Sequence, residues 1–426
     1  MPALDLEWIR AQFPALAQTV NGHPAVFFDG PGGTQVPQRV IDAISSYLIG
    51  ANANTHGAFA TSQRTDETIA AAHTGMADLL GCDPDEVVFG PNMTTLTFAM
   101  SRAIGRTLGP GDEIVVTRLD HDANVAPWRA LEERGVTVRA VDIDIEDCTL
   151  DMDDFARQIN TNTKLVAIGY ASNAVGTINN VAEVVKLAHA AGALAYVDAV
   201  HYAPHGPIDV RALDCDFLAC SPYKFFAPHM GALYGKREHL ARFQPYKVRP
   251  ASNDAPDRWE TGTKNHEGLA GVAAAIDYLA ELGARIQDSG VATPQIPNAQ
   301  PASPRRHALL AAMQAIQAYE RSLSEKLIAG LLAIPGLTFY GISDPERFGA
   351  RTPTVSVRIA GFTPRELASH LGEQGIFSWD GNYYALSLTE RLGVEDSGGM
   401  LRIGLAHYNT AEEIDRLLAA LNGLAR

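Results

Sequence analysis

Cysteine is scarce in this chain, which has four cysteines among 426 residues. Their spacing forms neither a disulfide framework nor a pair of metal-ligand positions, so we expect no bound metal and a reducing, cytoplasmic environment. Long apolar runs are missing as well, because no stretch reaches the roughly 20 residues that a membrane-spanning helix needs. The first residues carry Asp5, Glu7 and Arg10 among apolar side chains, which is unlike a secretory signal.

Positive charge is also in short supply. The 34 lysines and arginines are outnumbered by 49 aspartates and glutamates, which gives a formal net charge of −15. A chain this acidic is not expected to bind nucleic acid or an anionic membrane, and its charge mainly promotes solubility. The hydrophobic share of 46% and the charged share of 19% are typical of a globular enzyme.

Short apolar strands alternate with helical patterns of roughly 10 to 15 residues over much of the chain. This alternation predicts an α/β fold in which a mostly parallel seven-stranded sheet is covered by helices on both faces. After Gly336 the pattern changes to the short strands and helices of a smaller α+β C-terminal domain. The strands expected in the large sheet are 84–89, 113–117, 136–141, 164–168, 193–197, 217–220 and 232–234.

The length of the chain exceeds what one simple core can hold, so at least two domains are expected. We predict an N-terminal arm over residues 1–20, followed by a large domain over residues 21–286. Residues 287–304 are rich in proline, have little apolar content and show no period, so they are predicted to form a linker. The small C-terminal domain is predicted over residues 305–426.

Lys224 lies between two short apolar strands, 216–220 and 231–234, and is flanked by aromatic residues and prolines. Lysine is seldom buried without a reason. Apolar surroundings lower the pKa of its amine, which then can attack a carbonyl group. One interpretation is a lysine that holds pyridoxal 5'-phosphate as a Schiff base. The alternative is an ordinary lysine whose amine reaches solvent from a loop.

An acid follows one of the buried strands of the predicted sheet. Asp198 comes directly after strand 193–197, and only one strand separates it from Lys224. Ligands of parallel sheets bind at the carboxyl ends of the strands, so the two side chains are expected to share one edge. Asp198 could hold the pyridine nitrogen of the cofactor in its protonated form, which makes the ring a stronger electron sink. Alternatively, it caps the next helix or turn.

Two backbone segments are candidates for ligand contacts. Asn92 and Met93 stand where a strand turns into a helix, an arrangement that offers free N–H groups and a positive dipole to a phosphate, or is an ordinary helix cap. Gly32 and Gly33 follow the predicted strand 26–29. Two adjacent glycines let a backbone approach a ligand closely, although a plain turn would also use them.

Three further polar residues carry both a functional and a structural interpretation. His121 could stack on the cofactor ring, or it could be a histidine of structural use alone. Asn173 could donate a hydrogen bond to the cofactor hydroxyl or to a substrate carboxylate, or it could be a turn residue. Arg402 lies on the apolar strand 400–404 and is the best candidate to bind a substrate carboxylate in bidentate fashion, a surface ion pair being the alternative.

These residues stand in motifs that resemble, over nearly the whole chain, a fold-type I, class V pyridoxal-phosphate enzyme of the cysteine desulfurase and selenocysteine lyase group. That group also contains epimerase-like members. The resemblance runs from Phe13-Pro14-Ala15-Leu16 to the segment 406–415. Between them it includes Asp120-His121-Asp122-Ala123-Asn124, Ser172-Asn173 with Gly176-Thr177, Val197-Asp198-Ala199, Ser221 with Lys224, and Arg258-Trp259-Glu260-Thr261-Gly262-Thr263.

The resemblance implies catalytic roles for three residues. Lys224 would form the Schiff base and later carry the proton, Asp198 would pair with the pyridine nitrogen, and His121 would stack on the ring. The enzyme would bind its substrate, an α-amino acid, as an external aldimine. The implied cofactor-binding residues are Asn92, Met93, His121, Asn173, Asp198, His201, Ser221, Tyr223, Lys224 and Thr263. The implied substrate-binding residues are Arg402, Gly32, Gly33 and Asn173.

The phosphate is implied to be bound by Asn92, Met93 and Ser221, joined by Thr263 from the other subunit of a homodimer. The chain departs from the pattern of the group at three places. His201 replaces the usual glutamine, and Tyr223 replaces the histidine that usually precedes the lysine. The loop where a desulfurase carries its sulfur-accepting cysteine reads Trp379-Asp380-Gly381-Asn382-Tyr383-Tyr384-Ala385, with Tyr384 at about the position of the thiolate.

The expected function is therefore that of a pyridoxal-phosphate-dependent lyase that acts at Cβ of an α-amino acid. It would cleave a C–S bond of cysteine or a cysteine conjugate, or decarboxylate aspartate at Cβ with an aldol-type step. The alternatives are a true cysteine desulfurase, an epimerase or aminotransferase, and a non-catalytic protein that binds the cofactor. Persulfide formation needs a thiolate, which a phenol does not replace.

Overall fold

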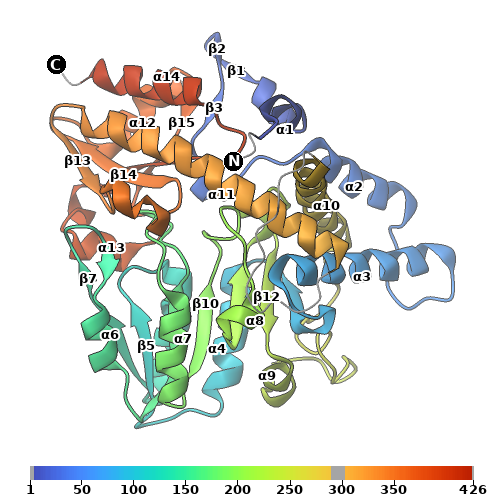
Figure 1. Ribbon diagram of the computed structural model, residues 1–426. Helices are drawn as coiled ribbons and strands as arrows, with labels where there is room; N and C mark the ends of the chain where they lie inside the picture. Colours follow the sequence, from blue (N-terminus) through green and yellow to red (C-terminus); the bar gives the residue numbers. More distant parts are fainter. Residues whose placement is uncertain (1–3, 289–302, 425–426) are drawn as a thin grey trace.

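The computed structural model describes residues 4–288 and 303–424. Its largest sheet has seven strands in the order β4-β12-β11-β10-β9-β5-β6 and forms the centre of one lobe (Figure 1). Neighbouring strands run parallel except where β12 meets β11 and β4. The predicted mostly parallel seven-stranded sheet is confirmed. Its strands are β4 (Val87–Gly90), β5 (Glu113–Thr117), β6 (Thr137–Val141), β9 (Thr163–Gly169), β10 (Leu194–Asp198), β11 (Phe217–Cys220) and β12 (Gly231–Gly235).

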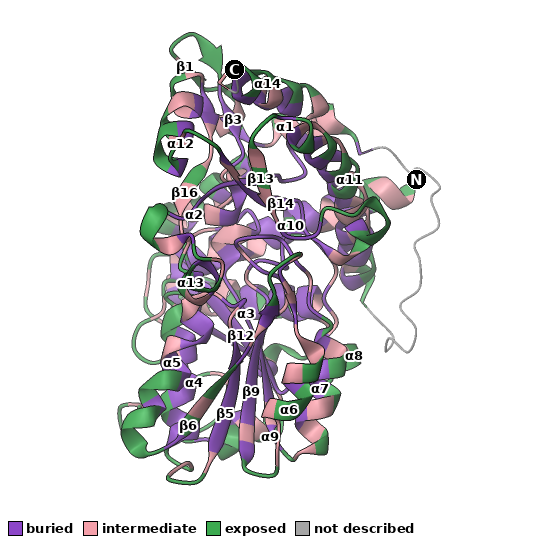
Figure 2. Cartoon of the chain, turned by 90° about the vertical axis from the view of Figure 1, so that its left-hand side faces the viewer, coloured by how far each residue is buried: buried purple, intermediate pink, exposed green. Residues whose placement is uncertain are grey.

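The central strands of this sheet are apolar on both faces, since helices cover both. Along β10, Tyr196 packs in a cluster with side chains of α4 (Met93–Gly105) and α5 (Ala126–Arg129), whereas Val197 packs on the opposite face with α7 (Val181–Ala190). Figure 2 shows the strands as the buried interior of this lobe. The carboxyl ends of β5, β9, β10 and β11 therefore meet at one edge, which faces the other lobe.

The second lobe is built on a four-stranded antiparallel sheet with the order β13-β14-β17-β16. The strands are β13 (Leu337–Tyr340), β14 (Thr354–Ile359), β16 (Trp379–Gly381) and β17 (Met400–Gly404). Its core packs against α11 (Pro304–Leu332), α12 (Pro364–Glu373) and α14 (Ala411–Asn422). This is the smaller α+β unit that the sequence predicts.

Long helices connect the two lobes. Helix α10 (His266–Asp288) packs against α2 (Gln38–Gly50), α3 (Ala60–Leu80) and α11, and α11 continues across to α14 (Figure 1). The predicted linker, 287–304, lies mostly outside the described residues. The predicted domain boundaries remain a prediction. One structural fact bears on the first boundary: β3 (Val26–Phe27) pairs in parallel with β15 (Ile376–Phe377), so this strand packs against the C-terminal lobe and not in the large sheet.

Two segments of the chain are irregular. Residues 122–134 form the short α5 between the 3₁₀ turns 122–124 and 130–134, because Pro127 starts a new helical turn. The loop expected around Tyr383 contains β16 and α13 (Leu386–Arg391). The remaining described elements are α1 (Leu6–Ala11), α6 (Met152–Gln158), α8 (Val210–Leu213), α9 (Arg237–Arg242), β1 (Thr19–Val20), β2 (His23–Pro24), β7 (Ile143–Asp144) and β8 (Thr149–Leu150). Within residues 4–288 and 303–424, none of the helices combines the length and the apolarity needed to cross a membrane.

Candidate active site

A cavity of about 90 Å³ opens at the carboxyl edge of the seven-stranded sheet. It brings together residues that are far apart in the sequence: Asp198 ends β10, Ser221 follows β11, and Asn173 follows β9. Nine of the predicted site residues line it, namely Asn92, Met93, His121, Asn173, Asp198, His201, Ser221, Tyr223 and Lys224. The parallel order of the strands explains this convergence, because each strand delivers its following loop to the same edge.

Lys224 lies in the interior of this cavity, and its amine donates a hydrogen bond to the carbonyl oxygen of Pro31. The pKa of the amine is lowered from 10.5 to about 7, chiefly by burial and also by the positive charge of Arg402, while the charges of Asp198 and Asp29 act in the opposite direction. The alternative of a lysine that reaches solvent from a loop does not describe this side chain. Near neutral pH a large fraction of the amine is therefore neutral and nucleophilic.

Asp198 is also buried in the cavity wall. Its Oδ1 accepts a hydrogen bond from the Val200 backbone N–H at 2.9 Å, which fixes the orientation of the carboxyl group. Burial raises the pKa of Asp198 to about 6, while the Val200 N–H and the charge of Lys224 act in the opposite direction. A cationic ring nitrogen facing the carboxylate would compensate for part of the solvation that the carboxylate loses on burial.

His121 is held as a neutral imidazole with a defined tautomer. Its Nδ1 accepts a hydrogen bond from the backbone N–H of Ala123 at 3.0 Å, so the ring proton lies on Nε2. The pKa of His121 is lowered to about 4, chiefly by burial and also by the charges of Lys224 and Arg402. The ring of Tyr384 stacks on the imidazole with a centroid distance of 5.5 Å and an interplanar angle of 23°.

The opposite end of the cavity is suited to a phosphate. Helix α4 begins there, with Asn92 as its N-cap, so the N–H groups of its first turn and its positive dipole end point to the cavity. The buried Ser221 lines the same end. Gly231 on β12 supports this turn from behind: a Cβ at this position would lie 2.4 Å from the backbone carbon of Asn92. The absence of a side chain at Gly231 therefore allows β12 to hold the helix start in place.

Arg402 stands next to this cavity without lining it. The guanidinium donates from Nη1 to the backbone oxygen of Asn173 at 2.9 Å, and the Tyr383 ring covers it at 4.2 Å from the centroid. Its Nε is buried and has no hydrogen-bond partner among the described residues. Burial lowers the pKa of Arg402 to about 10. A carboxylate ligand would pair with this buried cation and accept a hydrogen bond from its unused Nε.

Asp29 is a residue that the sequence argument did not single out. It follows β3, and its Oδ1 is buried without a hydrogen-bond partner in the described part of the chain. Burial raises the pKa of Asp29 to about 6, and the charges of Arg402 and Lys224 oppose the rise. Nothing in the sequence near Asp29 predicts this, because the two cations come from positions about 200 and 370 residues away in the sequence.

The three remaining predicted residues lie elsewhere. A Cβ on Gly32 would lie 2.3 Å from Trp379 Nε1, and one on Gly33 would lie 3.1 Å from the ring of Tyr223, so both glycines allow close packing beside the site. Thr263 is exposed and does not line the cavity of its own chain.

The loop that carries Tyr383 and Tyr384 is fixed to the site by its backbone. Asn173 donates from Nδ2 to the Tyr383 oxygen at 2.9 Å, and the Asp122 N–H donates to the Tyr384 oxygen at 2.7 Å. Both tyrosines adopt left-handed backbone conformations, with φ of 56° and 59°. Two consecutive non-glycine residues in this region are uncommon and mark strain at a functional place.

No thiol lines the cavity. Cys148, Cys215 and Cys220 are buried elsewhere, and Cys82 is half-buried. Burial raises the pKa of all four thiols, so none of them is a thiolate near neutral pH. The loop position at which the resemblance implies a thiolate holds the exposed ring of Tyr384 instead.

Comparisons with known proteins agree with this fold. The family model described as aminotransferase class-V matches residues 26–293 and 307–417. A cysteine desulfurase of Pectobacterium atrosepticum is 32% identical over 438 aligned residues, which cover 99% of this chain and 98% of the relative. The apo structure of a cysteine desulfurase from Thermococcus onnurineus superposes with a TM-score of 0.85 at 26% identity, over 100% of this chain and 99% of that one.

A second solved structure, a cysteine desulfurase from Escherichia coli in an S-sulfonic acid form, gives a TM-score of 0.81 at 26% identity over 99% and 98% of the two chains. The chain belongs to the class-V aminotransferase family. It is a pyridoxal-phosphate-dependent enzyme of the cysteine desulfurase-like group, as the motifs suggested. The neutral amine, the buried acid and the helix start in one small cavity fit this cofactor.

Proposed function

We propose that this enzyme is a lyase that cleaves the Cβ–S bond of cysteine or a small cysteine conjugate and releases the sulfur to solvent. The observation that carries the proposal is the aromatic ring of Tyr384 stacked on His121, in a site that no thiol lines. The kinship with cysteine desulfurases supports sulfur as the leaving atom. The absent thiolate argues against transfer of that sulfur to this chain.

The residues that would hold the cofactor follow from the geometry. The start of α4 at Asn92 and Met93, together with Ser221, would bind the phosphate. Asp198 would face the pyridine nitrogen, and His121 would lie against the ring. Asn173 and His201 would lie near the ring hydroxyl, and Tyr223 would complete the wall beside Lys224. Pyridoxal phosphate, when bound, supplies an electron sink for the carbon atoms of the amino acid.

Substrate binding and proton transfer fall to the chain's own side chains. Arg402 would bind the α-carboxylate through its unused Nε. The glycine pair Gly32 and Gly33 would contact the substrate through its backbone, since the space at their missing side chains is taken by Trp379 and Tyr223. The amine of Lys224, with a pKa of about 7, would take the proton from Cα and pass it to the departing sulfur. Tyr383 keeps water from the face of Arg402 that it covers.

The fate of the sulfur separates this proposal from the desulfurase alternative. In an elimination, the Cα proton and the Cβ thiolate leave cysteine, and water then releases the remaining atoms as pyruvate and ammonia. The sulfur departs as sulfide, so no electron acceptor is needed. Alanine forms instead only when a nucleophile accepts the sulfur at a higher oxidation state. The phenol of Tyr384 is not such a nucleophile.

A product analysis tests the proposal. Cofactor-loaded enzyme is incubated with cysteine in the absence of added thiols, and sulfide, pyruvate and alanine are measured together. We expect sulfide and pyruvate in equal amounts and no persulfide on the protein by mass spectrometry. Lys224→Ala is the control and should release neither. Alanine as the main product, with a persulfide on any of the four cysteines, would overturn the proposal in favour of a desulfurase.

The same screen covers other amino acids. Carbon dioxide released from aspartate would show decarboxylation at Cβ. No product, and no change in the visible absorption of the bound cofactor with any common amino acid, would show a non-catalytic protein.

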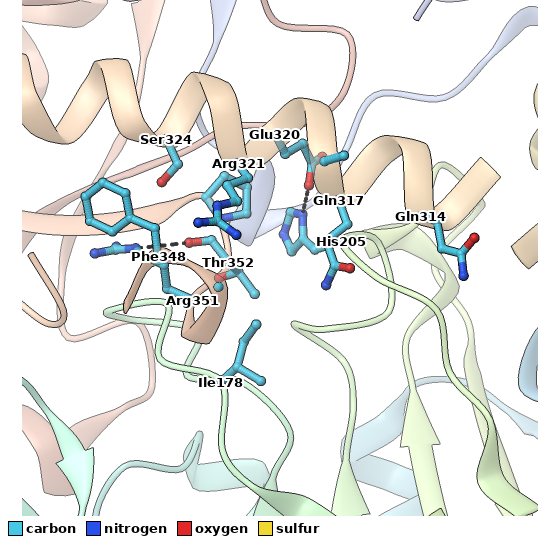
Figure 3. A pocket seen from close by; sticks show the side chains of 13 residues that line it. Ile178, His205, Gln314, Gln317, Glu320, Arg321, Ser324, Phe348, Arg351 and Thr352 are labelled. Carbon is cyan, nitrogen blue, oxygen red and sulfur yellow. Dashed lines mark hydrogen bonds and ion pairs between the residues drawn. The ribbon is translucent and has the colours of Figure 1, made fainter. Parts of the chain in front are cut away.

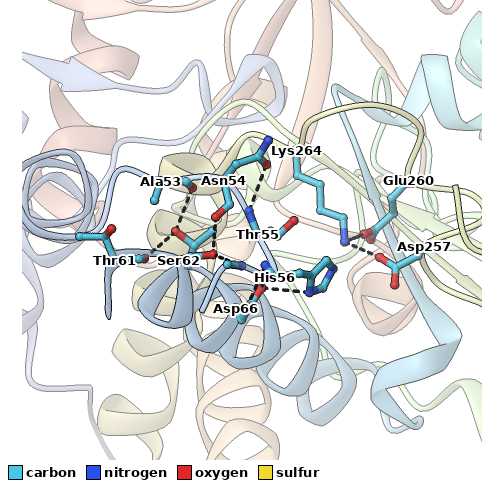
Figure 4. A network of polar contacts seen from close by, with 12 residues as sticks. Ala53, Asn54, Thr55, His56, Thr61, Ser62, Asp66, Asp257, Glu260 and Lys264 are labelled. Atoms are coloured by element: carbon cyan, nitrogen blue, oxygen red, sulfur yellow. Dashed lines mark hydrogen bonds and ion pairs between the residues drawn. The ribbon is translucent and has the colours of Figure 1, made fainter. Parts of the chain in front are cut away.

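We also propose that the enzyme is a homodimer in which Thr263 reaches the phosphate site of the partner. Lys264, in the loop before α10, forms ion pairs with Asp257 and Glu260, each at 2.7 Å (Figure 4). Its neighbour Thr263 is exposed. The nearby segment 53–57 is fixed by Ser62 and Asp66. It stands between the exposed apolar side chains of Ile49 and Phe59, which a partner could cover.

Mixed dimers test the placement of Thr263. If Thr263 acts across an interface, Thr263→Ala lowers cofactor affinity, and mixing it with Lys224→Ala restores one complete site per heterodimer. If it acts within its own chain, mixing restores nothing. A cytoplasmic location is proposed on the strength of the four free cysteines.

A further inference from the structure

A second cavity, larger than the one at Lys224, lies behind the site on the side of α11. It encloses about 290 Å³ between α11, the segment 348–353 and the loop at His205 (Figure 3). None of the predicted site residues lines it. The polar side chains that matter here are Gln314, Glu320, Arg321 and Ser324 of α11, with His205 and Thr352 opposite.

Polar atoms without partners face this cavity. Ser324 is 2% exposed, and its Oγ makes no hydrogen bond to any described residue; the same holds for Oε1 of Glu320, which is 1% exposed. Leaving a buried polar group unpaired costs roughly 1–3 kcal/mol. These two groups lie one turn apart on the same helix and line the same cavity, which indicates a place that receives a polar ligand.

The charges around the cavity define the chemistry of that ligand. Arg321 lines it with a guanidinium that is half-exposed and bound to Glu325 only through Nε at 3.1 Å. Glu320 is buried and accepts a hydrogen bond from His205 Nδ1 at 2.8 Å. A carboxylate suits the guanidinium of Arg321 and the hydroxyl of Ser324. A hydrogen-bond donor on the same molecule suits the unpaired Oε1 of Glu320.

The two cavities share a wall. Thr352 lines the larger cavity, and its Oγ1 is 3.2 Å from His201 Nε2. The His205 ring packs edge-on against the His201 ring with a centroid distance of 5.3 Å. His201 in turn lines the cavity of Lys224. A ligand that contacts Thr352 or Glu320 therefore acts one residue away from the cofactor site, and any coupling between the sites must be reciprocal.

We propose that this cavity is a second, regulatory binding site for a small carboxylate that carries an α-amino or α-hydroxyl group. The ligand binds between Arg321 and Ser324 through its carboxylate and donates to Glu320 through the α-substituent. Its occupancy changes the position of His201 beside the cofactor.

Lactate is the probe of choice, because it has the expected carboxylate and hydroxyl but no amine to react with the cofactor. Binding to the cofactor-loaded enzyme is measured by calorimetry, and the visible absorption of the cofactor is recorded in the same titration. We expect saturable binding and a spectral change with the same midpoint. Arg321→Met and Ser324→Val should weaken binding at least tenfold and abolish the spectral change.

Three further variants make the test decisive. Arg347→Met removes an exposed arginine of the neighbouring turn that does not line the cavity, and it should bind lactate as the wild type does. Arg321→Met, at a half-exposed position, remains as a lesion should Ser324→Val fail to fold. Gln314→Leu, almost three turns from Ser324 on the same helix, should bind lactate as the wild type does. Arg402→Met separates the two sites. The proposal would be overturned if Arg402→Met lost lactate binding while the α11 variants kept it. The absence of any binding at tens of millimolar lactate would overturn it as well. Glycine and alanine then distinguish an amino from a hydroxyl ligand.

Discussion

Replacing Lys224 by methionine should make the cofactor-free protein more stable, although it removes the catalytic amine. The amine has a pKa of about 7 in the folded protein and 10.5 when unburied. Between these two values the unfolded chain holds a proton that the folded chain has released, so the free energy of unfolding of the wild type rises with pH in this window. Methionine has nearly the same shape and carries no such penalty.

The magnitude follows from the shift. One unit of pKa corresponds to ~1.4 kcal/mol, so at about pH 7.5 the neutral amine costs the wild type ~4 kcal/mol. The hydrogen bond from Lys224 to the Pro31 carbonyl is lost in the variant, which offsets about 1 kcal/mol. The expected gain is therefore about 3 kcal/mol at about pH 7.5, and it should vanish near pH 10.5 as the unfolded lysine also becomes neutral.

Urea unfolding of both apoproteins, followed by tryptophan fluorescence at one protein concentration, measures this difference. Lys236→Met is the matched control. Lys236 is partly desolvated, but its bonds to Asp214 and Asp216 raise its pKa, so its replacement should destabilise the protein. Two results would show that the Lys224 amine is not neutral in the folded protein. Either Lys224→Met is no more stable than the wild type at about pH 7.5, or the difference in stability does not change with pH.

Three substitutions test other parts of the site. Arg402→Lys keeps the charge but loses the planar donor pair, so KM for the amino acid should rise about tenfold or more while cofactor affinity, measured by fluorescence titration, stays the same. Gly231→Ala forces the start of α4 away from β12, because the added Cβ would meet the backbone of Asn92. It should weaken cofactor binding at least tenfold with little effect on KM for the amino acid. Unchanged cofactor binding would contradict this close packing. Tyr384→Cys places a thiol beside His121. After incubation with cysteine, we expect mass spectrometry to show a persulfide on the new thiol. If no persulfide forms, more than the missing thiol separates this enzyme from desulfurases.

The strand pattern of the large lobe was predictable because it depends on local information. Runs such as 113–117 and 217–220 are apolar on both faces, and only strands covered by helices on both sides of a sheet need that composition. The start of α4 was predictable for a similar reason, since Asn92 is a helix cap that acts within four residues. Nine of the thirteen residues that line the cavity at Lys224 were predicted, through the motifs and their order along the strands.

The broken helix at Pro127 and the placement of β3 could not be found in the same manner. The pairing of Val26 with Ile376 joins segments 350 residues apart, and no local pattern states which of two sheets a short apolar strand will join. The burial of Asp29 could not be predicted for the same reason, because its unpaired carboxyl group lies near Arg402 and Lys224 only in the folded chain.

The sequence by itself determined the elements, the family motifs and the absence of any cysteine from the loop at 379–385. Only the tertiary structure decided that the Lys224 amine is largely neutral, that the Tyr384 ring covers His121, and that a second polar cavity shares a wall with the first. The physical reason is that propensity and periodicity act over a few neighbouring residues, whereas desolvation and stacking are properties of groups that folding brings together from distant parts of the chain.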